Sequence, residues 1–392
     1  MSEIKVNSIK GVSATSAAIS INNTDGTATA NLSNRQGRNL IINGGMTIAQ
    51  RGTSSSVSNN SYATVDRFRL THNGADEAPQ QAQVDVASGT TPYSLGFRKA
   101  FRVTNGNQTS GAGSNYFVRI STMLEGQDIV NSGWNYNSSS SFITLSFWVK
   151  SSVAQNFYSF IRSTDGTMYQ YPFETGSLTA NTWTKVTKTI PGNSNLQFDN
   201  NVGGAFELWI HQFSGTDETS SGVALNTWAT YDGTAKMPDF PSTWYTTNDA
   251  TYEITGVQLE VGSVATDFEH LSFADELRRC QRYFFNIKGN TGSRSGIAAY
   301  ANSSSSLRAM VQFPVPMRAI PTFSGTATAM IMDSSDDSDN FNISGFANGG
   351  SPTTSNPSRM CLDIGTGGMT AGQGGQLEFR ANNGEMNFSS EL

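Results

Sequence analysis

The stretch FITLSFWVK, residues 142–150, alternates apolar and polar side chains with a period of two. Its apolar odd positions are Ile143, Leu145, Phe147 and Val149. Its even positions include Thr144, Ser146, Trp148 and Lys150. This alternation predicts a β-strand with one face on a core and the other face on solvent or a groove.

Seven further segments have strand-like sequences and are separated by Gly, Asn, Asp and Ser turns: residues 97–104, 116–123, 157–163, 169–174, 183–190, 205–213 and 252–261. About eight such strands predict two packed antiparallel sheets, most simply a jelly roll. In the last segment the apolar phase changes across Gly256, which predicts a β-bulge.

The composition of the 392 residues agrees with an all-β fold. Ser, Thr and Asn number 50, 41 and 34, about a third of the chain, and aromatics make up 10%. These residues suit sheets and turns better than long helices, and the aromatic content argues against disorder. The length predicts two or three folded units, at about 150 residues each.

Charge and hydropathy exclude several classes of function. The net charge is −6 and the basic residues are scattered, so nucleic-acid binding is not expected. No apolar run has signal-peptide or membrane-span length, so we expect an intracellularly made, soluble protein. Cys280 and Cys361 are expected to be reduced, buried thiols.

Four regions are predicted along the chain. Residues 1–61 contain no aromatic side chain, although 41 follow, so they are expected to form an attachment arm or stalk that orders against other chains. A floppy terminus is the alternative. Residues 62–271 form the sandwich, residues 272–285 a connecting helix, and residues 286–392 a smaller β domain.

The predicted helix has Ser272 as its N-cap and basic residues toward its end. Its apolar positions follow helical spacing and are expected to face a core or a partner helix. These positions are Phe273, Leu277, Cys280 and Phe284.

Several stretches resemble tail-fibre proteins of short-tailed phages that infect marine bacteria. They are NLIINGGMTIAQRGT at 39–53, VDRF at 65–68, YEITGVQLEVGSVATDFEHLSFADELRRCQRYFF at 252–285, FPVPMRAIPTFS at 313–324 and the final FSSEL. The resemblance covers nearly the whole chain and rests on the order of these motifs, since none of them is catalytic or exclusive.

The resemblance implies a homotrimeric virion protein of the tail, assembled in the host cytoplasm. Its N-terminal segment would bind other phage tail or virion proteins. Its sandwich would be similar to a carbohydrate-binding module, and the fibre would recognise a host surface glycan or an outer-membrane protein. The resemblance supplies no catalytic residue and no cofactor.

Catalytic motifs are missing from the sequence. There is no HExxH, CxxC, GxSxG or GxxxxGK, and only three histidines are present. A zinc site or a nucleophilic triad is therefore not expected. Glycoside hydrolysis needs only two carboxylates, and composition does not exclude it.

Strand alternation suggests one glycan platform. Glu207, Trp209 and His211 share a strand face, and Trp148 lies on a polar face of its own strand. A sugar ring can stack its C–H face on an indole while Glu or His side chains bind its hydroxyls. Ordinary packing under loops is the alternative.

A second candidate is an aromatic-rich loop with Trp228, Tyr231, Trp244 and Tyr245, for which simple loop anchoring is the alternative. An acidic run contains Asp333, Asp336, Asp337 and Asp339. It lacks the Gly and the distal Glu of an EF-hand loop, so a solvated loop is preferred over a calcium site.

The sequence therefore predicts a non-enzymatic tail fibre that attaches to the host surface. A head fibre or adaptor with a purely structural role is one alternative, and a polysaccharide-depolymerising tailspike is another. Tailspikes of that kind usually have a parallel β-helix, but no short repeat recurs in this sequence.

Overall fold

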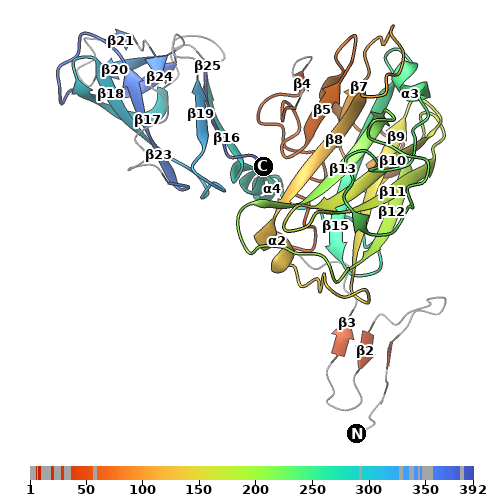
Figure 1. Cartoon of the computed structure of the whole chain (residues 1–392). Helices are drawn as coiled ribbons and strands as arrows, with labels where there is room; N and C mark the ends of the chain where they lie inside the picture. The colour runs from red at the N-terminus through yellow and green to blue at the C-terminus, as the bar shows by residue number, and fades with distance from the viewer. Residues whose placement is uncertain are drawn as a thin grey trace.

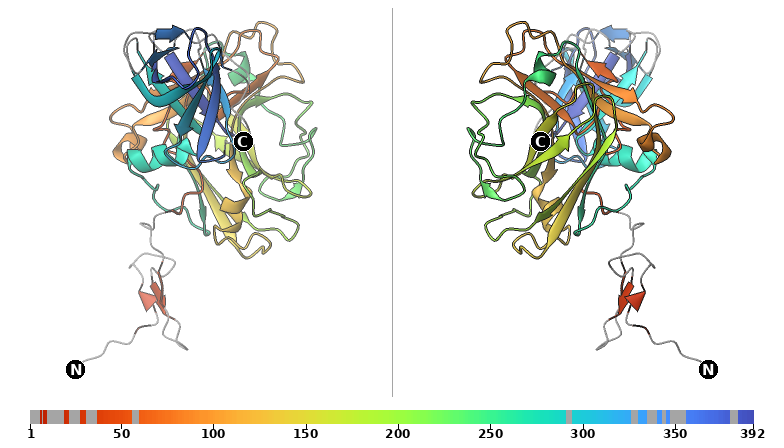
Figure 2. Two further views of the ribbon diagram at one scale, coloured as in Figure 1. Left: turned by 90° about the vertical axis from the view of Figure 1, so that its left-hand side faces the viewer. Right: turned by 90° about the vertical axis from the view of Figure 1, so that its right-hand side faces the viewer.

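The computed structural model consists of an arm, a large β-sandwich and a second β domain (Figure 1). It describes residues 6, 8–9, 19–21, 28–30, 37–55, 60–290, 294–325, 330–334, 340–342, 345–346, 356–379 and 384–392. The arm points away from the sandwich, and the second domain lies beside the sandwich (Figures 1 and 2). The predicted all-β class is confirmed. No helix among the described residues is long and apolar enough to cross a membrane.

Two six-stranded antiparallel sheets form the sandwich. Sheet I has the order β14 (Ala229–Thr230), β11 (Tyr169–Ser177), β10 (Asn156–Ser163), β13 (Gly204–Ser214), β8 (Phe117–Glu125), β5 (Arg69–Asn73). Sheet II has the order β12 (Thr184–Pro191), β9 (Phe142–Ser151), β15 (Thr251–Val261), β7 (Lys99–Thr104), β6 (Gln80–Asp85), β4 (Ser54–Ser55). Short helices α1 (Thr91–Ser94), α2 (Gly126–Val130) and α3 (Thr243–Thr246) lie in the connections.

Period-two alternation determines which side chains enter the core. The four odd-numbered apolar residues of β9 are all 0% exposed and belong to the core between the sheets. The predicted bulge in β15 is confirmed, since its pairing with β9 shifts between Thr255 and Gln258. Gly256 there has φ +64°, and a Cβ atom would lie 2.6 Å from the ring of Phe97, so this position requires glycine.

The second domain has a core of its own and two antiparallel sheets. One has the order β16 (Phe284–Gly289), β25 (Gly384–Ser389), β19 (Thr322–Gly325). The other has the order β21 (Asn340–Asn342), β20 (Met330–Ser334), β24 (Gly374–Phe379), β17 (Arg294–Ser303), β18 (Ser306–Gln312), β23 (Arg359–Gly365), β22 (Gly345–Phe346).

The arm is shorter than the sequence suggested. Its described strands β1 (Ser8–Ile9), β2 (Ile19–Ile21) and β3 (Ala28–Ala30) form one small sheet. From Gly37 onward the chain packs against the sandwich, and Ile41 and Met46 are buried in its core. The expected boundary at residue 61 is therefore too late. The sequence sign of this packing was the spacing of apolar residues within 39–53. Aliphatic side chains such as Ile41 and Met46 can enter a core without an aromatic residue beside them.

The connecting helix also differs from its prediction. Helix α4 spans Phe273–Gln281, and Ser272 caps it by accepting a hydrogen bond from the Asp275 amide. The expectation that Phe273 packs in an apolar stripe is wrong, because its side chain is 65% exposed. The buried residues of α4 are Glu276 and Cys280. Glu276 can be buried because its carboxylate accepts a hydrogen bond from the Asn43 amide at 2.6 Å.

A buried carboxylate joins the sandwich to the chain that follows α4. Glu125, at the end of β8, is 0% exposed. Arg282 donates to both of its oxygens at 2.7 Å, and the Tyr283 hydroxyl donates at 2.6 Å. Burial alone would raise the pKa of Glu125, but the hydrogen bonds from Arg282 and Tyr283 outweigh it and lower that pKa below its ordinary value.

A second ion pair fastens the last residues of the chain. The guanidinium of Arg67 is 2% exposed, bonds to Glu391, and lies 3.5 Å from the centroid of the Tyr283 ring. Arg51 also contacts Glu391, at 3.2 Å. We call Glu125, Arg282, Tyr283, Arg67 and Glu391 the joint, because they tie the sandwich, α4 and the second domain together.

We expect Arg67→Met to lower the free energy of unfolding by about 3–5 kcal/mol, because it leaves the buried carboxylate of Glu391 without its main partner. Chemical denaturation measures this loss. The matched control is Lys288→Met, which breaks an exposed pair with Glu385 and should cost less than about 1 kcal/mol. Equal effects of the two substitutions would contradict the role given to the joint.

Candidate functional site

The outer face of sheet II carries a pocket around Trp148. Strand alternation places Phe147 and Val149 in the core and turns Trp148 and Ser146 outward. Ser146 and Trp148 of β9, with Gly256 of β15, form the floor. The indole of Trp148 is half-buried, so one part of it packs while another part stays accessible.

A segment that crosses sheet II forms one wall of this pocket. We call residues 262–271 the strap. It is fixed to β15 because the Thr266 hydroxyl donates to Glu260 at 2.6 Å and the Gln258 amide donates to the Asp267 carbonyl at 3.3 Å. Phe268 of the strap packs edge-on against Phe97, with ring centroids 4.9 Å apart.

His270 and Lys185 complete the rim. One ring nitrogen of His270 lies 2.9 Å from the Leu95 carbonyl oxygen, and Lys185 is directly opposite Trp148 in the pairing of β12 with β9. Both side chains are exposed, as is Asp267. The pocket therefore presents cationic, hydroxyl and carboxylate groups around an aromatic floor.

Trp183 is a second tryptophan next to this pocket and is not among the predicted site residues. It is half-buried and packs in the same cluster as Trp148 and Phe268. The ammonium nitrogen of Lys150 lies 5.1 Å from the centre of its ring. Alternation in TWTKVTKTI, residues 182–190, puts Trp183 on the same strand face as Lys185, and this is visible in the sequence. The pairing of β12 with β9, which brings that face next to Trp148, is not visible in the sequence.

The arrangement suits a polar ligand with an apolar face. The pocket has a volume of about 210 Å³, below the usual range for drug-sized ligands, so one sugar ring is a better fit than an extended organic molecule. A ring can lay its C–H face on an indole while Ser146, Lys185 and Asp267 bind its hydroxyls.

Trp209, the other predicted platform residue, lies on the outer face of sheet I. It is 8% exposed and stacks on Phe160 at 5.9 Å. The guanidinium groups of Arg119, Arg162 and Arg69 lie 4.2, 5.6 and 5.9 Å from its ring.

The predicted neighbours of Trp209 are buried with it. Glu207 is 1% exposed and pairs with Arg69 at 3.1 Å and with Arg162 at 2.6 Å. His211 is 0% exposed, and burial together with the charges of Arg119 and Lys236 lowers its pKa well below the ordinary value.

The structure does not bring the two predicted platform tryptophans together. Trp148 belongs to β9 in sheet II and Trp209 to β13 in sheet I, and each points away from the shared core. Alternation in the sequence shows which side chains of a strand point outward, but it does not show to which sheet the strand belongs. The sequence alone therefore could not separate Trp148 and Trp209 into two sheets.

The aromatic loop has the structure of an anchor. Trp244 and Tyr245 are 0% exposed and belong to the sandwich core. Trp228 is half-buried and donates its indole N–H to the Pro191 carbonyl at 2.7 Å, and Tyr231 lies 4.8 Å from the Arg162 guanidinium.

Metal binding has no candidate in the part of the chain that the structure describes, where no group of three or more His, Cys, Asp or Glu could hold an ion. Asp336, Asp337 and Asp339 of the acidic run lie outside the described residues, as does the side chain of Asp333. Cys280 and Cys361 are buried and form no disulfide, as predicted.

Comparison with known proteins finds no matching family model and no matching curated protein. Among solved structures, the chain is similar to the enzymatically active domain of tailspike protein 4 of bacteriophage CBA120, with 9% identity and a TM-score of 0.30. That alignment covers 57% of this chain and 21% of the tailspike chain.

Two carbohydrate-binding modules are also similar in structure. The module CBM4 has 10% identity and a TM-score of 0.29, with 57% of this chain and 99% of the module covered. A family 11 module from Clostridium thermocellum, solved with a mixed-linked tetrasaccharide, has 10% identity and a TM-score of 0.23, with 56% and 98% covered.

The two tryptophans are expected to respond differently to truncation. Trp209→Ala should lower the free energy of unfolding by about 3–5 kcal/mol, because it leaves a cavity beneath three arginines. Trp148→Ala should cost only about 1 kcal/mol, because its half-buried indole has less packing to lose. Denaturation of both variants tests the difference, and a larger loss for Trp148→Ala would contradict the assignment of Trp209 to packing.

Proposed function

We propose that this chain is a non-catalytic glycan-binding protein of a phage virion, a tail fibre that attaches to a polysaccharide on the host surface. The observation that carries glycan binding is the pocket on sheet II, where half-buried Trp148 lies among exposed hydrogen-bonding groups, while half-buried Trp183 packs against the same apolar cluster beside it. The resemblance of its motifs to phage tail fibres supports the virion role.

Such a pocket binds one sugar ring weakly. A shallow aromatic site with a few hydrogen bonds is expected to have a dissociation constant of about 1 mM, or about 4 kcal/mol. Three chains in a fibre and several fibres in a particle would raise the apparent affinity through effective concentration. Trimerisation therefore belongs to the proposal as well as glycan binding.

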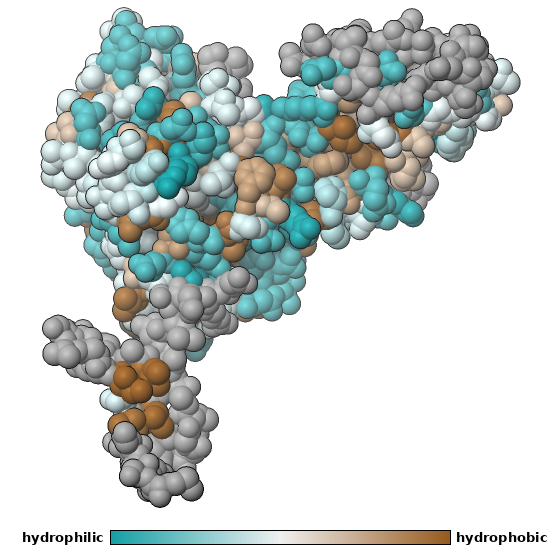
Figure 3. Space-filling model, turned by 180° about the vertical axis from the view of Figure 1, so that it is seen from behind, coloured by the Kyte–Doolittle hydropathy of each residue, from teal (hydrophilic) through white to brown (hydrophobic). Residues whose placement is uncertain are grey.

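The arm supports assembly with other chains. Val6 and Ile9 are 42% and 53% exposed, and Figure 3 shows hydrophobic residues on the arm surface. A three-stranded sheet of such short strands buries too little apolar surface to be stable alone. Further copies of the arm, or other virion proteins, would cover these residues.

The alternatives predict different results. A head fibre or adaptor would bind no polysaccharide through Trp148, and the position of the N-terminus in an intact virion separates it from a tail fibre. A depolymerising tailspike would release new reducing ends from host polysaccharide, whereas the proposed binder releases none.

We expect Trp148→Ala and Trp183→Ala to weaken binding of host polysaccharide by about tenfold each, since each removes a stacking surface worth about 1.4 kcal/mol. Adsorption of intact particles should fall further than binding of the single chain, because avidity multiplies the loss.

Tyr300→Ala is the control for this experiment, since Tyr300 is a 48% exposed aromatic residue of the second domain. It should leave binding unchanged. Wild-type binding and adsorption by both tryptophan variants would rule out the pocket as the attachment site.

Assembly gives a separate prediction. Sedimentation of the full chain at micromolar concentration should report three copies, and deletion of residues 1–36 should reduce the assembly, because the exposed apolar residues of the arm would be lost. A stable monomer of the full chain would contradict trimerisation without affecting the glycan pocket.

A further inference from the structure

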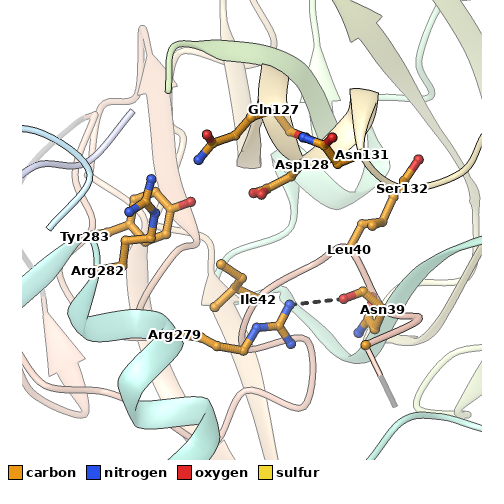
Figure 4. Close-up of a pocket in the computed structure, with 11 residues that line it drawn as sticks. Asn39, Leu40, Ile42, Gln127, Asp128, Asn131, Ser132, Arg279, Arg282 and Tyr283 are labelled. Carbon is orange, nitrogen blue, oxygen red and sulfur yellow. Dashed lines mark hydrogen bonds between the residues drawn. The ribbon is translucent and has the colours of Figure 1, made fainter. Parts of the chain in front are cut away.

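A larger cavity lies at the opposite end of the connecting helix from the strap, where the arm meets the sandwich. It has a volume of about 480 Å³, within the range of small-molecule sites. Three segments line it: residues 37–42, α2 with the turn that follows, and the end of α4. Figure 4 shows their side chains converging on a common space.

One wall of this cavity, from α2, presents hydrogen-bond acceptors. Asp128 is half-buried, and no hydrogen bond or ion pair to its carboxylate exists among the described residues. Gln127 and Asn131 use their amide N–H groups elsewhere in the protein, at Glu125 and at the Gln127 carbonyl. Their side-chain oxygens remain available as acceptors.

The opposite wall presents a donor and an apolar surface. The Arg279 guanidinium is held in place by a hydrogen bond to the Asn39 carbonyl at 3.1 Å, drawn in Figure 4, and has further N–H groups to donate. Leu40 and Ile42 line the same side. The guanidinium of Arg282 is already paired with the carboxylate of Glu125, so it adds no unpaired positive charge to this wall.

This pattern determines the class of ligand. A simple anion would be repelled by Asp128, and a simple cation would be repelled by Arg279. Neighbouring hydroxyls suit both walls, because one can donate to the carboxylate while the next accepts from the guanidinium. The C–H face of a ring can cover Leu40 and Ile42.

We infer that this cavity is a second carbohydrate site, which binds one hexose ring through Asp128 and Arg279. Burial, with the nearby charge of Glu125, raises the pKa of the Asp128 carboxyl above its ordinary value, as expected for a carboxylate that lacks its hydrogen-bond donors. The site does not depend on Trp148, so it stands whether or not the proposed attachment pocket does.

The test uses the full chain with Trp148→Ala, so that the pocket on sheet II does not contribute. Saturation-transfer NMR is recorded with glucose, galactose, mannose and N-acetylglucosamine separately. At least one hexose should receive saturation from this chain. Adding Asp128→Asn or Arg279→Met should weaken that binding by about tenfold, because each removes a charged hydrogen-bond partner.

Asp217→Asn, at an exposed carboxylate of the sandwich, is the matched control and should change nothing. Thermal unfolding of each variant confirms that it folds, which is expected for Asp128→Asn because its carboxylate has no partner to lose. Absence of saturation for all four sugars would overturn the inference, as would binding unaffected by both variants. Displacement of the sugar by glycine, a zwitterion of matching charges, would reassign the site to amino-acid ligands.

Discussion

The structure depends on one buried charge, the carboxylate of Glu125. A carboxylate at 0% exposure costs several kcal/mol unless its oxygens are fully paired. Arg282 and Tyr283 provide that pairing, and they are adjacent residues immediately after α4. This pairing fixes the chain where it leaves α4 toward β16 and the second domain.

The sequence motifs at 39–53, 65–68, 252–285, 313–324 and 388–392 meet at the joint. Arg51 comes from the first motif, Arg67 from VDRF, Arg282 from the long third motif and Glu391 from the last residues, and all of them belong to the joint or contact it. Arg318, from the fourth motif, donates to the Glu391 carbonyl at 3.1 Å. These motifs therefore encode how the domains are joined, and they say nothing about the ligand.

The sequence predicted the sandwich well because alternation is a local signal. Every predicted strand exists, and the bulge at Gly256 was visible as a change of phase. Burial against distant segments was not visible. Phe273 fitted a helical stripe but is exposed, and Trp209 had polar neighbours in sequence but three arginines above it in space. Trp183 joins Trp148 only through strand pairing, and the cavity at Asp128 needs three segments that are far apart in the chain.

The attachment pocket and the joint differ in what holds them in place. Packing of Phe268 and hydrogen bonds with Glu260, Gln258 and Arg38 fix the strap. The exposed rim residues Lys185 and His270, in contrast, contribute little to the core. Substitutions at such rim positions usually change stability by less than about 0.5 kcal/mol. The chemistry facing a ligand can therefore change without disturbing Glu125 or the sheets. The proposed attachment to a variable surface polysaccharide would use this separation, because recognition residues could vary while the domains stay joined.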